Sequence, residues 1–240
     1  FIKAGIKDGK VSNSVPSLVH AVFGVPAHEV HGAVFAFVSE WLSQFASKGS
    51  LPFVPHMVNL PATNEDLRRQ LNIPNSALVI ASYGGEDCFN VPFVPAAVME
   101  ALQKRRDLFF LFMNFPPFLV HERAIFLPGN PDPEFKTRFI NTCDAMIHAQ
   151  RLGESFGLAC GEFSSRQKPV ITFGGSYGRS HIQILGDKAI LYNTEQELVL
   201  ILLNLTKQFI GGQTWDNYSE QFAPAPVMEK FKQVFLGAGV

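Results

Sequence analysis

The sequence lacks several features that would point to particular classes of protein. Its 240 residues contain three isolated cysteines (Cys88, Cys143 and Cys160), which form neither a disulfide framework nor a metal-binding spacing. No apolar run approaches the roughly 18 residues expected of a membrane-spanning helix. The net charge of −1 offers no general attraction for nucleic acid or an anionic membrane. We therefore expect a cytoplasmic protein of a reducing compartment, with no transmembrane segment and no nucleic-acid partner.

The chain does have ample material for a hydrophobic core. Apolar residues make up 47% of it, and phenylalanine alone occupies 23 positions. Apolar runs alternate with helical patterns, which predicts an α/β fold, a Rossmann-like parallel sheet with helices on both faces. The predicted strands cover residues 18–23, 33–38, 53–55, 78–83, 108–113, 125–129, 143–148, 170–173 and 189–192. The predicted helices begin at Ser39 and cover residues 64–71, 93–105, 133–141, 195–205 and 227–235.

Two carboxylates separated by seven residues mark the most informative segment. Glu154 and Glu162 flank a small-residue turn, in a stretch whose pattern is strand, glycine-containing turn, helix, strand. Such a unit presents a helix N-terminus to an anion such as a diphosphate. Ser155 is a good N-cap candidate, which would leave the amides of residues 156–158 pointing outward. The two glutamates would lie about 12 Å apart along the helix axis, the scale of a nucleotide sugar from its ribose to its sugar ring.

This segment is similar to the E-x7-E motif of retaining glycosyltransferases of the GT-B fold, especially glycosyltransferase family 4. The likeness extends to the order of strands and helices over residues 53–205 and to the Lys-Pro-Val-Ile run that follows the motif. It implies a nucleotide-sugar-binding Rossmann-like domain at 51–205, preceded by the end of an acceptor-side domain at 1–50. Residues 206–240 would form helices that cross back toward the N-terminal part, and a simple C-terminal packing helix is the alternative. The acceptor-binding half is therefore absent, truncated or supplied by further domains of a larger polypeptide.

The resemblance also implies roles for individual residues. Glu162 would accept hydrogen bonds from the nucleotide ribose, and Glu154 would act near the donor sugar and phosphates. The alternative is that Glu154 caps a turn and Glu162 is a solvated helix residue. His20 would contact the donor sugar or the acceptor, and a histidine satisfied within the core is its alternative. The further donor-binding residues would be Gly84, Gly85, Leu127, Ser155, Phe156, Gly157 and Leu158.

The sequence departs from the family where the diphosphate would bind. Family members usually carry an arginine just after the strand that precedes Gly84 and a lysine a few residues later. Here residues 81–87 contain no cation and end in Glu86 and Asp87. Arg151 is the nearest candidate substitute, and a solvent-facing loop arginine is its alternative. A divalent cation is a third source of positive charge, but no Asp-x-Asp motif or other metal spacing is present and no motif requires a cofactor.

These observations favour a retaining GT-B glycosyltransferase that transfers a hexose from a nucleoside diphosphate sugar to a glycan or other hydroxyl acceptor. The resemblance implies that catalysis would be mainly electrostatic, and no side chain is an obvious covalent nucleophile. The missing cations and the short N-terminal part favour an alternative, a non-catalytic sugar-nucleotide-binding module or scaffold. A sugar-nucleotide epimerase is a third hypothesis, which epimer formation without acceptor would identify.

Overall fold

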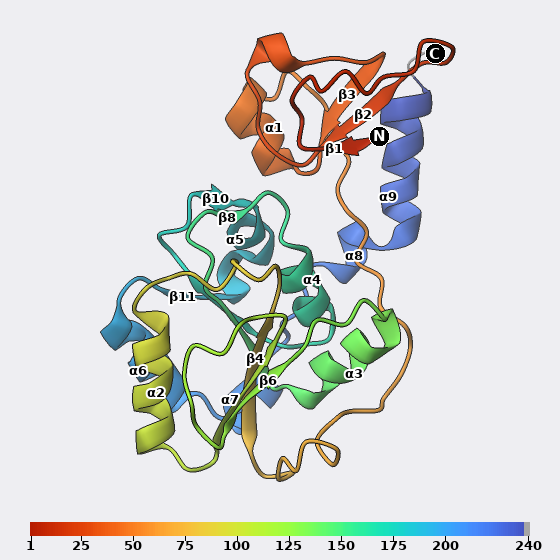
Figure 1. The fold of residues 1–240 in the computed structure, drawn as a ribbon. Coiled ribbons are helices and arrows are strands. Elements are labelled where there is room, and N and C mark those ends of the chain that lie inside the picture. The colour runs from red at the N-terminus through yellow and green to blue at the C-terminus, as the bar shows by residue number, and fades with distance from the viewer. Residues whose placement is uncertain (238–240) are drawn as a thin grey trace.

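The computed structural model describes residues 1–237, which form a large parallel sheet, a smaller parallel sheet and a separate pair of short strands (Figure 1). The large sheet has six strands in the order β11-β9-β7-β4-β5-β6, and every neighbouring pair is parallel. This sheet confirms the predicted Rossmann-like α/β fold. Its strands are β4 (Leu78–Tyr83), β5 (Leu108–Met113), β6 (Ala124–Leu127), β7 (Ala145–His148), β9 (Val170–Phe173) and β11 (Ala189–Tyr192).

Helices cover both faces of the large sheet, which is why its central strands are continuous apolar runs. Successive side chains of β4 point to opposite faces. Ile80 packs into the cluster beneath α2 (Val94–Lys104) and α6 (Glu195–Asn204). Val79 and Ala81 pack into the cluster beneath α3 (Pro133–Thr142) and α4 (Leu158–Ser165). The sheet is thus buried between two layers of helices.

The separate pair of short strands comprises β8 (Gly153–Glu154) and β10 (Gly178–Arg179), which are parallel. Strand β8 lies between β7 and α4 in the chain, so it carries the first glutamate of the motif. Helix α5 (Ser180–Leu185) and the 3-10 turn η2 (Gly186–Lys188) lead from β10 to β11.

The predicted helix over residues 64–71 is wrong, and this segment forms turns instead. The reason lies in competing partners for its amides. Leu67 donates its amide to the Thr142 hydroxyl, and the Arg68 amide bonds the Asp66 carboxylate. In a helix capped by Asn64 the Arg68 amide would bond the Asn64 carbonyl, so its bond to Asp66 competes with that helix.

The N-terminal part forms the smaller sheet, in the order β1-β2-β3. Its strands are β1 (Ile2–Lys3), β2 (Leu18–Ala21) and β3 (Val34–Phe37), with a short 3-10 turn η1 (Ala27–Glu29) between the last two. Helix α1 (Glu40–Ser47) follows, and Ser39 caps it as predicted by accepting from the Leu42 amide. The strand predicted at 53–55 is reduced to a single bridge between Phe53 and Phe37.

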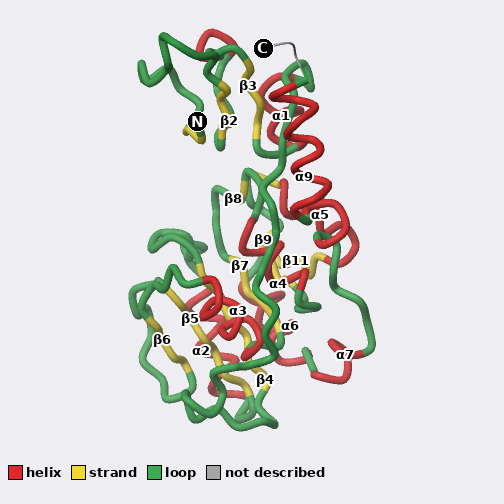
Figure 2. Tube along the Cα trace, turned by 90° about the vertical axis from the view of Figure 1, so that its right-hand side faces the viewer, coloured by secondary structure: helices red, strands yellow, loops and turns green. Residues whose placement is uncertain are grey.

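The C-terminal segment returns to the N-terminal sheet (Figures 1 and 2). It contains α7 (Lys207–Gly211), α8 (Ser219–Phe222) and α9 (Pro224–Phe231), which continues as a π-helical turn η3 (Lys232–Leu236). Phe235 is buried and its ring centroid lies 5.9 Å from that of His20 on β2. The division into domains at residues 50 and 205 stays a prediction. None of the helices within residues 1–237 has the length and apolar character needed to cross a membrane.

Candidate functional site

A cavity of about 380 Å³ lies at the carboxyl ends of β4, β5 and β6. Gly84 follows β4, Asn114 follows β5, and Gly129 comes shortly after β6. The Asn114 carboxamide donates to the Gly84 carbonyl at 2.8 Å and so joins two of these strand ends. Open α/β sheets bind ligands at the carboxyl ends of their strands, so the position of this cavity suits a ligand.

Glu162 lies beside this cavity with both carboxylate oxygens engaged. It is 3% exposed on α4, so the alternative of a solvated helix residue is wrong. One oxygen accepts from the Tyr83 hydroxyl, and the other lies 2.5 Å from Lys136 Nζ. Both partners also line the cavity. Burial, and then the Glu162 charge, raise the pKa of the Tyr83 hydroxyl well above its usual range, so Tyr83 stays neutral and donates.

The turn before α4 differs from the prediction in its cap. The N-cap is Gly157, which has a left-handed φ of 87°, and the Ser155 carbonyl instead accepts from the Ser39 hydroxyl. A Cβ at Gly157 would lie 2.6 Å from the Cβ of His181, so packing as well as φ requires glycine there. Glu154 precedes this turn, at the end of β8.

Glu154 contacts a buried histidine that sequence reasoning did not assign to the site. Glu154 Oε1 lies 2.9 Å from His148 Nε2, and about 30% of the Glu154 side chain is exposed. His148 Nδ1 is 2.9 Å from Thr172 Oγ1, which is also 2.9 Å from His181 Nε2. His148 and Thr172 lie side by side in register on the neighbouring strands β7 and β9, both of which were predicted as strands.

Cys160 adjoins the two histidines. Its sulfur and one nitrogen of each imidazole lie within 4.8 Å of one another, and all three residues are buried. Both imidazoles are nevertheless hydrogen-bonded to Thr172. Burial, and then Glu154, raise the pKa of the Cys160 thiol well above its usual range, which keeps this thiol protonated. The arrangement is therefore that of a hydrogen-bonded chain.

The remaining predicted residues are spread over several locations. Arg151 is exposed on the loop after β7, where its amide donates to Asn90 Oδ1. Gly85 follows Gly84, and Leu127 ends β6 with its half-buried side chain against the core. Phe156 is buried, Leu158 begins α4, and the roles of all these residues stay predictions.

His20 lies in a separate apolar cavity between β2 and the C-terminal helices. Its Nε2 is 2.6 Å from the Val54 carbonyl, and its ring lies 5.6 Å from that of His56. Burial lowers the pKa of His20, and the Val54 carbonyl opposes this effect. These contacts agree with the alternative of a satisfied core histidine, and the catalytic role stays a prediction.

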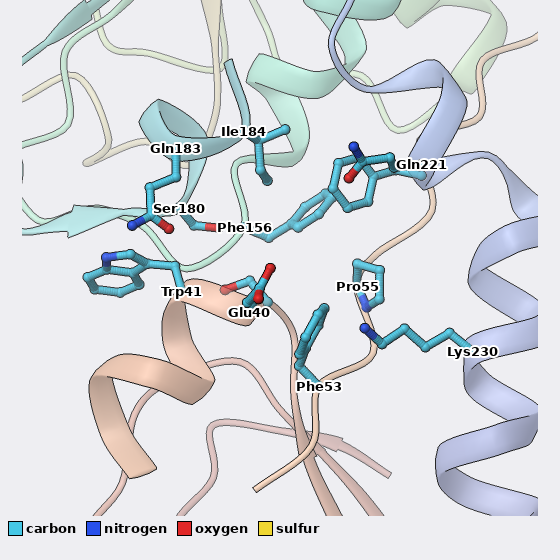
Figure 3. Close-up of a pocket in the computed structure, with 12 residues that line it drawn as sticks. Glu40, Trp41, Phe53, Pro55, Phe156, Ser180, Gln183, Ile184, Gln221 and Lys230 are labelled. Carbon is cyan, nitrogen blue, oxygen red and sulfur yellow. The ribbon is translucent and has the colours of Figure 1, made fainter. Parts of the chain in front are cut away.

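A further cavity, of about 290 Å³, lies between the N-terminal part and the part of the protein that contains the large sheet (Figure 3). The Glu40 side chain points into it from α1, and Lys230 reaches it from α9 beside Phe53. Lys230 Nζ lies 3.1 Å from the centroid of the Phe53 ring. Burial lowers the pKa of Lys230, and Glu40 opposes this effect. The lining mixes aromatic and polar groups: Ser39, Glu40, Trp41, Phe53, Pro55, Phe156, Ser180, Gln183, Ile184, Gln221, Phe222 and Lys230.

No protein-family profile and no curated protein matches the sequence, but solved structures match the fold. Staphylococcus aureus TarM, as a point mutant in complex with Fondaparinux, alpha-GlcNAc-glycerol and UDP, has a TM-score of 0.64 at 11% identity. Anabaena HepE, in complex with UDP and glucose, has a TM-score of 0.63 at 16% identity. WaaG, a glycosyltransferase involved in lipopolysaccharide biosynthesis, has a TM-score of 0.58 at 13% identity.

The match to TarM covers 83% of this chain and 43% of TarM. The match to HepE covers 86% of this chain and 63% of HepE, and the match to WaaG covers 83% of this chain and 60% of WaaG. The chain thus spans about half the length of these proteins. At such low identity the likeness concerns the fold alone. It is the GT-B glycosyltransferase fold that the E-x7-E segment predicted.

Proposed function

We propose that the chain is the donor-binding part of a retaining glycosyltransferase, which transfers a hexose from a nucleoside diphosphate sugar to a glycan or other hydroxyl acceptor. One observation carries this proposal. Glu162, the second glutamate of the motif, is a buried carboxylate bonded to Tyr83 and Lys136, which both line a cavity at the carboxyl ends of three parallel strands. A carboxylate in this position is suited to accept hydrogen bonds from ribose hydroxyls.

The nucleotide would lie along the strand ends. Its base would enter the cavity that Asn114 and Gly129 help to line, and its ribose would reach Glu162. Each carboxylate oxygen has two lone pairs, so Glu162 can accept ribose hydroxyls while it keeps Tyr83 and Lys136. The Lys136 ammonium has three donors, and Glu162 uses one of them. Lys136 would therefore supply part of the positive charge that is missing after β4.

The chemistry would be electrostatic. The amides at the start of α4 and the Lys136 charge would stabilise negative charge on the leaving diphosphate. Glu154 would hold hydroxyls of the donor sugar with the carboxylate oxygen that does not contact His148, and the reaction would need no cofactor. Arg151 would add a second cation from the loop after β7.

The acceptor would use the cavity shown in Figure 3. Its Trp41 ring offers an apolar face, while Glu40 and Gln183 offer hydrogen bonds to hydroxyl groups. Residues of α1, α5 and the C-terminal segment line this cavity, so it would form part of an acceptor site. The three cysteines are free thiols, in keeping with a reaction in the cytoplasm.

Transfer of label from nucleoside diphosphate sugars tests the proposal. We expect the chain to bind a donor measurably and to transfer its sugar more slowly than the usual rate of about 1–10³ per second. Donor binding without any transfer or hydrolysis would favour the alternative, a non-catalytic binding module. The absence of cations in residues 81–87 is the observation that favours this alternative. Epimer formation without acceptor would identify an epimerase.

A further inference from the structure

A buried series of hydrogen bonds leads from Glu154 to residues of the large sheet and of α5. It runs from Glu154 through His148 and Thr172 to His181, with 2.9 Å at each step. Thr172 and His181 are fully buried, and His148 is 5% exposed. The Tyr192 hydroxyl donates to the His148 carbonyl at 3.0 Å and fixes the backbone at the centre of this series.

The positions of the protons follow from the partners. The Thr172 hydroxyl has one proton, so it donates to one imidazole and accepts from the other. If His148 is neutral, its Nε2 carries the proton toward Glu154, and Thr172 donates to its Nδ1. If His148 is a cation, both of its nitrogens donate, and Thr172 donates to His181. In both arrangements His148 Nε2–H donates to an ionised Glu154.

His181 is the last residue of this series of hydrogen bonds. Within residues 1–237, His181 Nδ1 is buried and has no hydrogen-bond partner. Burial, and then His148, lower the pKa of His181 well below its usual range, so His181 is neutral. The Cβ of His181 packs against Gly157 in the turn before α4. These buried residues therefore have two effects. His148 orients Glu154 by a hydrogen bond, and His181 supports the Gly157 turn by packing.

We infer that His148 is a positioning residue for the proposed reaction. It holds one oxygen of Glu154 and directs the other oxygen toward a hydroxyl of the donor sugar. Thr172 and His181 fix the imidazole in turn, because a ring bonded at both nitrogens has one orientation. This inference rests on the proposed function, in which Glu154 contacts the donor sugar.

Two conservative variants separate positioning from a merely structural role. In His148→Gln, the carboxamide nitrogen reaches the place of Nε2 and still donates to Glu154. In His148→Asn, the shorter carboxamide still meets Thr172 but does not reach Glu154. His148→Asn should lower kcat by roughly tenfold to a hundredfold, the range for losing a hydrogen bond to a charged group. His148→Gln should lower kcat by a much smaller factor.

The affinity for a nucleoside diphosphate should be the same in both variants, because Glu162 and Lys136 are untouched. Equal kcat values for the two variants, or a loss of nucleoside diphosphate affinity as large as the loss of kcat, would overturn the inference. Nitrogen NMR of His148 gives a readout that needs no substrate. An Nε2 without a proton in the wild-type protein would overturn the inference as well. A wild-type chain that binds no nucleotide would instead overturn the proposed function.

Discussion

Replacing Lys136 by methionine tests how the nucleotide site balances its charges. Methionine keeps much of the apolar stem but leaves Glu162 with Tyr83 as its remaining partner. Breaking a buried ion pair costs about 3–5 kcal/mol. The Lys136 side chain is 25% exposed, so water compensates in part, and we expect a loss of about 1–3 kcal/mol in the free energy of unfolding.

Urea denaturation measures this loss, and calorimetry measures the effect on ligands. Lys136→Met should weaken binding of a nucleoside diphosphate more than binding of the corresponding nucleoside. The double variant Lys136→Met/Glu162→Gln should recover stability, because no unpaired charge stays buried. Lys104 provides a matched control, since it pairs with Glu100 on α2 and both side chains are well exposed. Lys104→Met should change stability by less than about 1 kcal/mol and leave binding unaltered.

Two results would refute this reasoning. An equal loss of affinity for nucleoside and diphosphate would show that Lys136 does not act on phosphate. Unchanged stability of Lys136→Met would show that Glu162 does not depend on the lysine for its burial.

Three further predictions concern other parts of the chain. Trp41→Ala should raise the KM for the acceptor with little change in donor affinity, and a matching loss for both substrates would remove Trp41 from an acceptor site. Arg151→Ala should reduce affinity for a diphosphate far more than for the nucleoside in calorimetric titrations; equal effects would mean that Arg151 does not bind phosphate. Burial lowers the pKa of His20, His56 and His181 below 6.5, so the unfolded chain binds more protons and the free energy of unfolding should fall as pH drops below about 6.5. Urea denaturation at about pH 7, 6 and 5 checks this slope, and constant stability would contradict it.

The sheet could be predicted from the sequence because its strands are buried on both faces. Strands β4 and β5 match their apolar runs to the residue, since little polar character interrupts them. The segment at 64–71 could not be predicted in the same way. Its amphipathic pattern suits a helix, but the Asp66 carboxylate takes the Arg68 amide, which would otherwise bond the Asn64 carbonyl.

The site was predictable in outline and not in its contacts. The spacing of Glu154 and Glu162 indicated a nucleotide-sugar site, and the structure places Glu162 beside a cavity at the strand ends. The partners of Glu162 could not be predicted, because Tyr83 lies 79 residues away in the sequence and Lys136 lies 26 residues away. We expected a cation next to β4, whereas the cation that lines the cavity is Lys136 on α3.

Calorimetric titration of the wild-type chain and of Glu162→Ala with nucleoside diphosphates and their sugars tests the central claim most directly. The wild-type chain should bind at least one of these ligands. Glu162→Ala should bind it roughly tenfold to a hundredfold more weakly, the range for losing hydrogen bonds to a charged group. Urea denaturation should show that the variant still folds. Equal affinity of the two proteins, or no binding by the wild-type chain, would contradict the account.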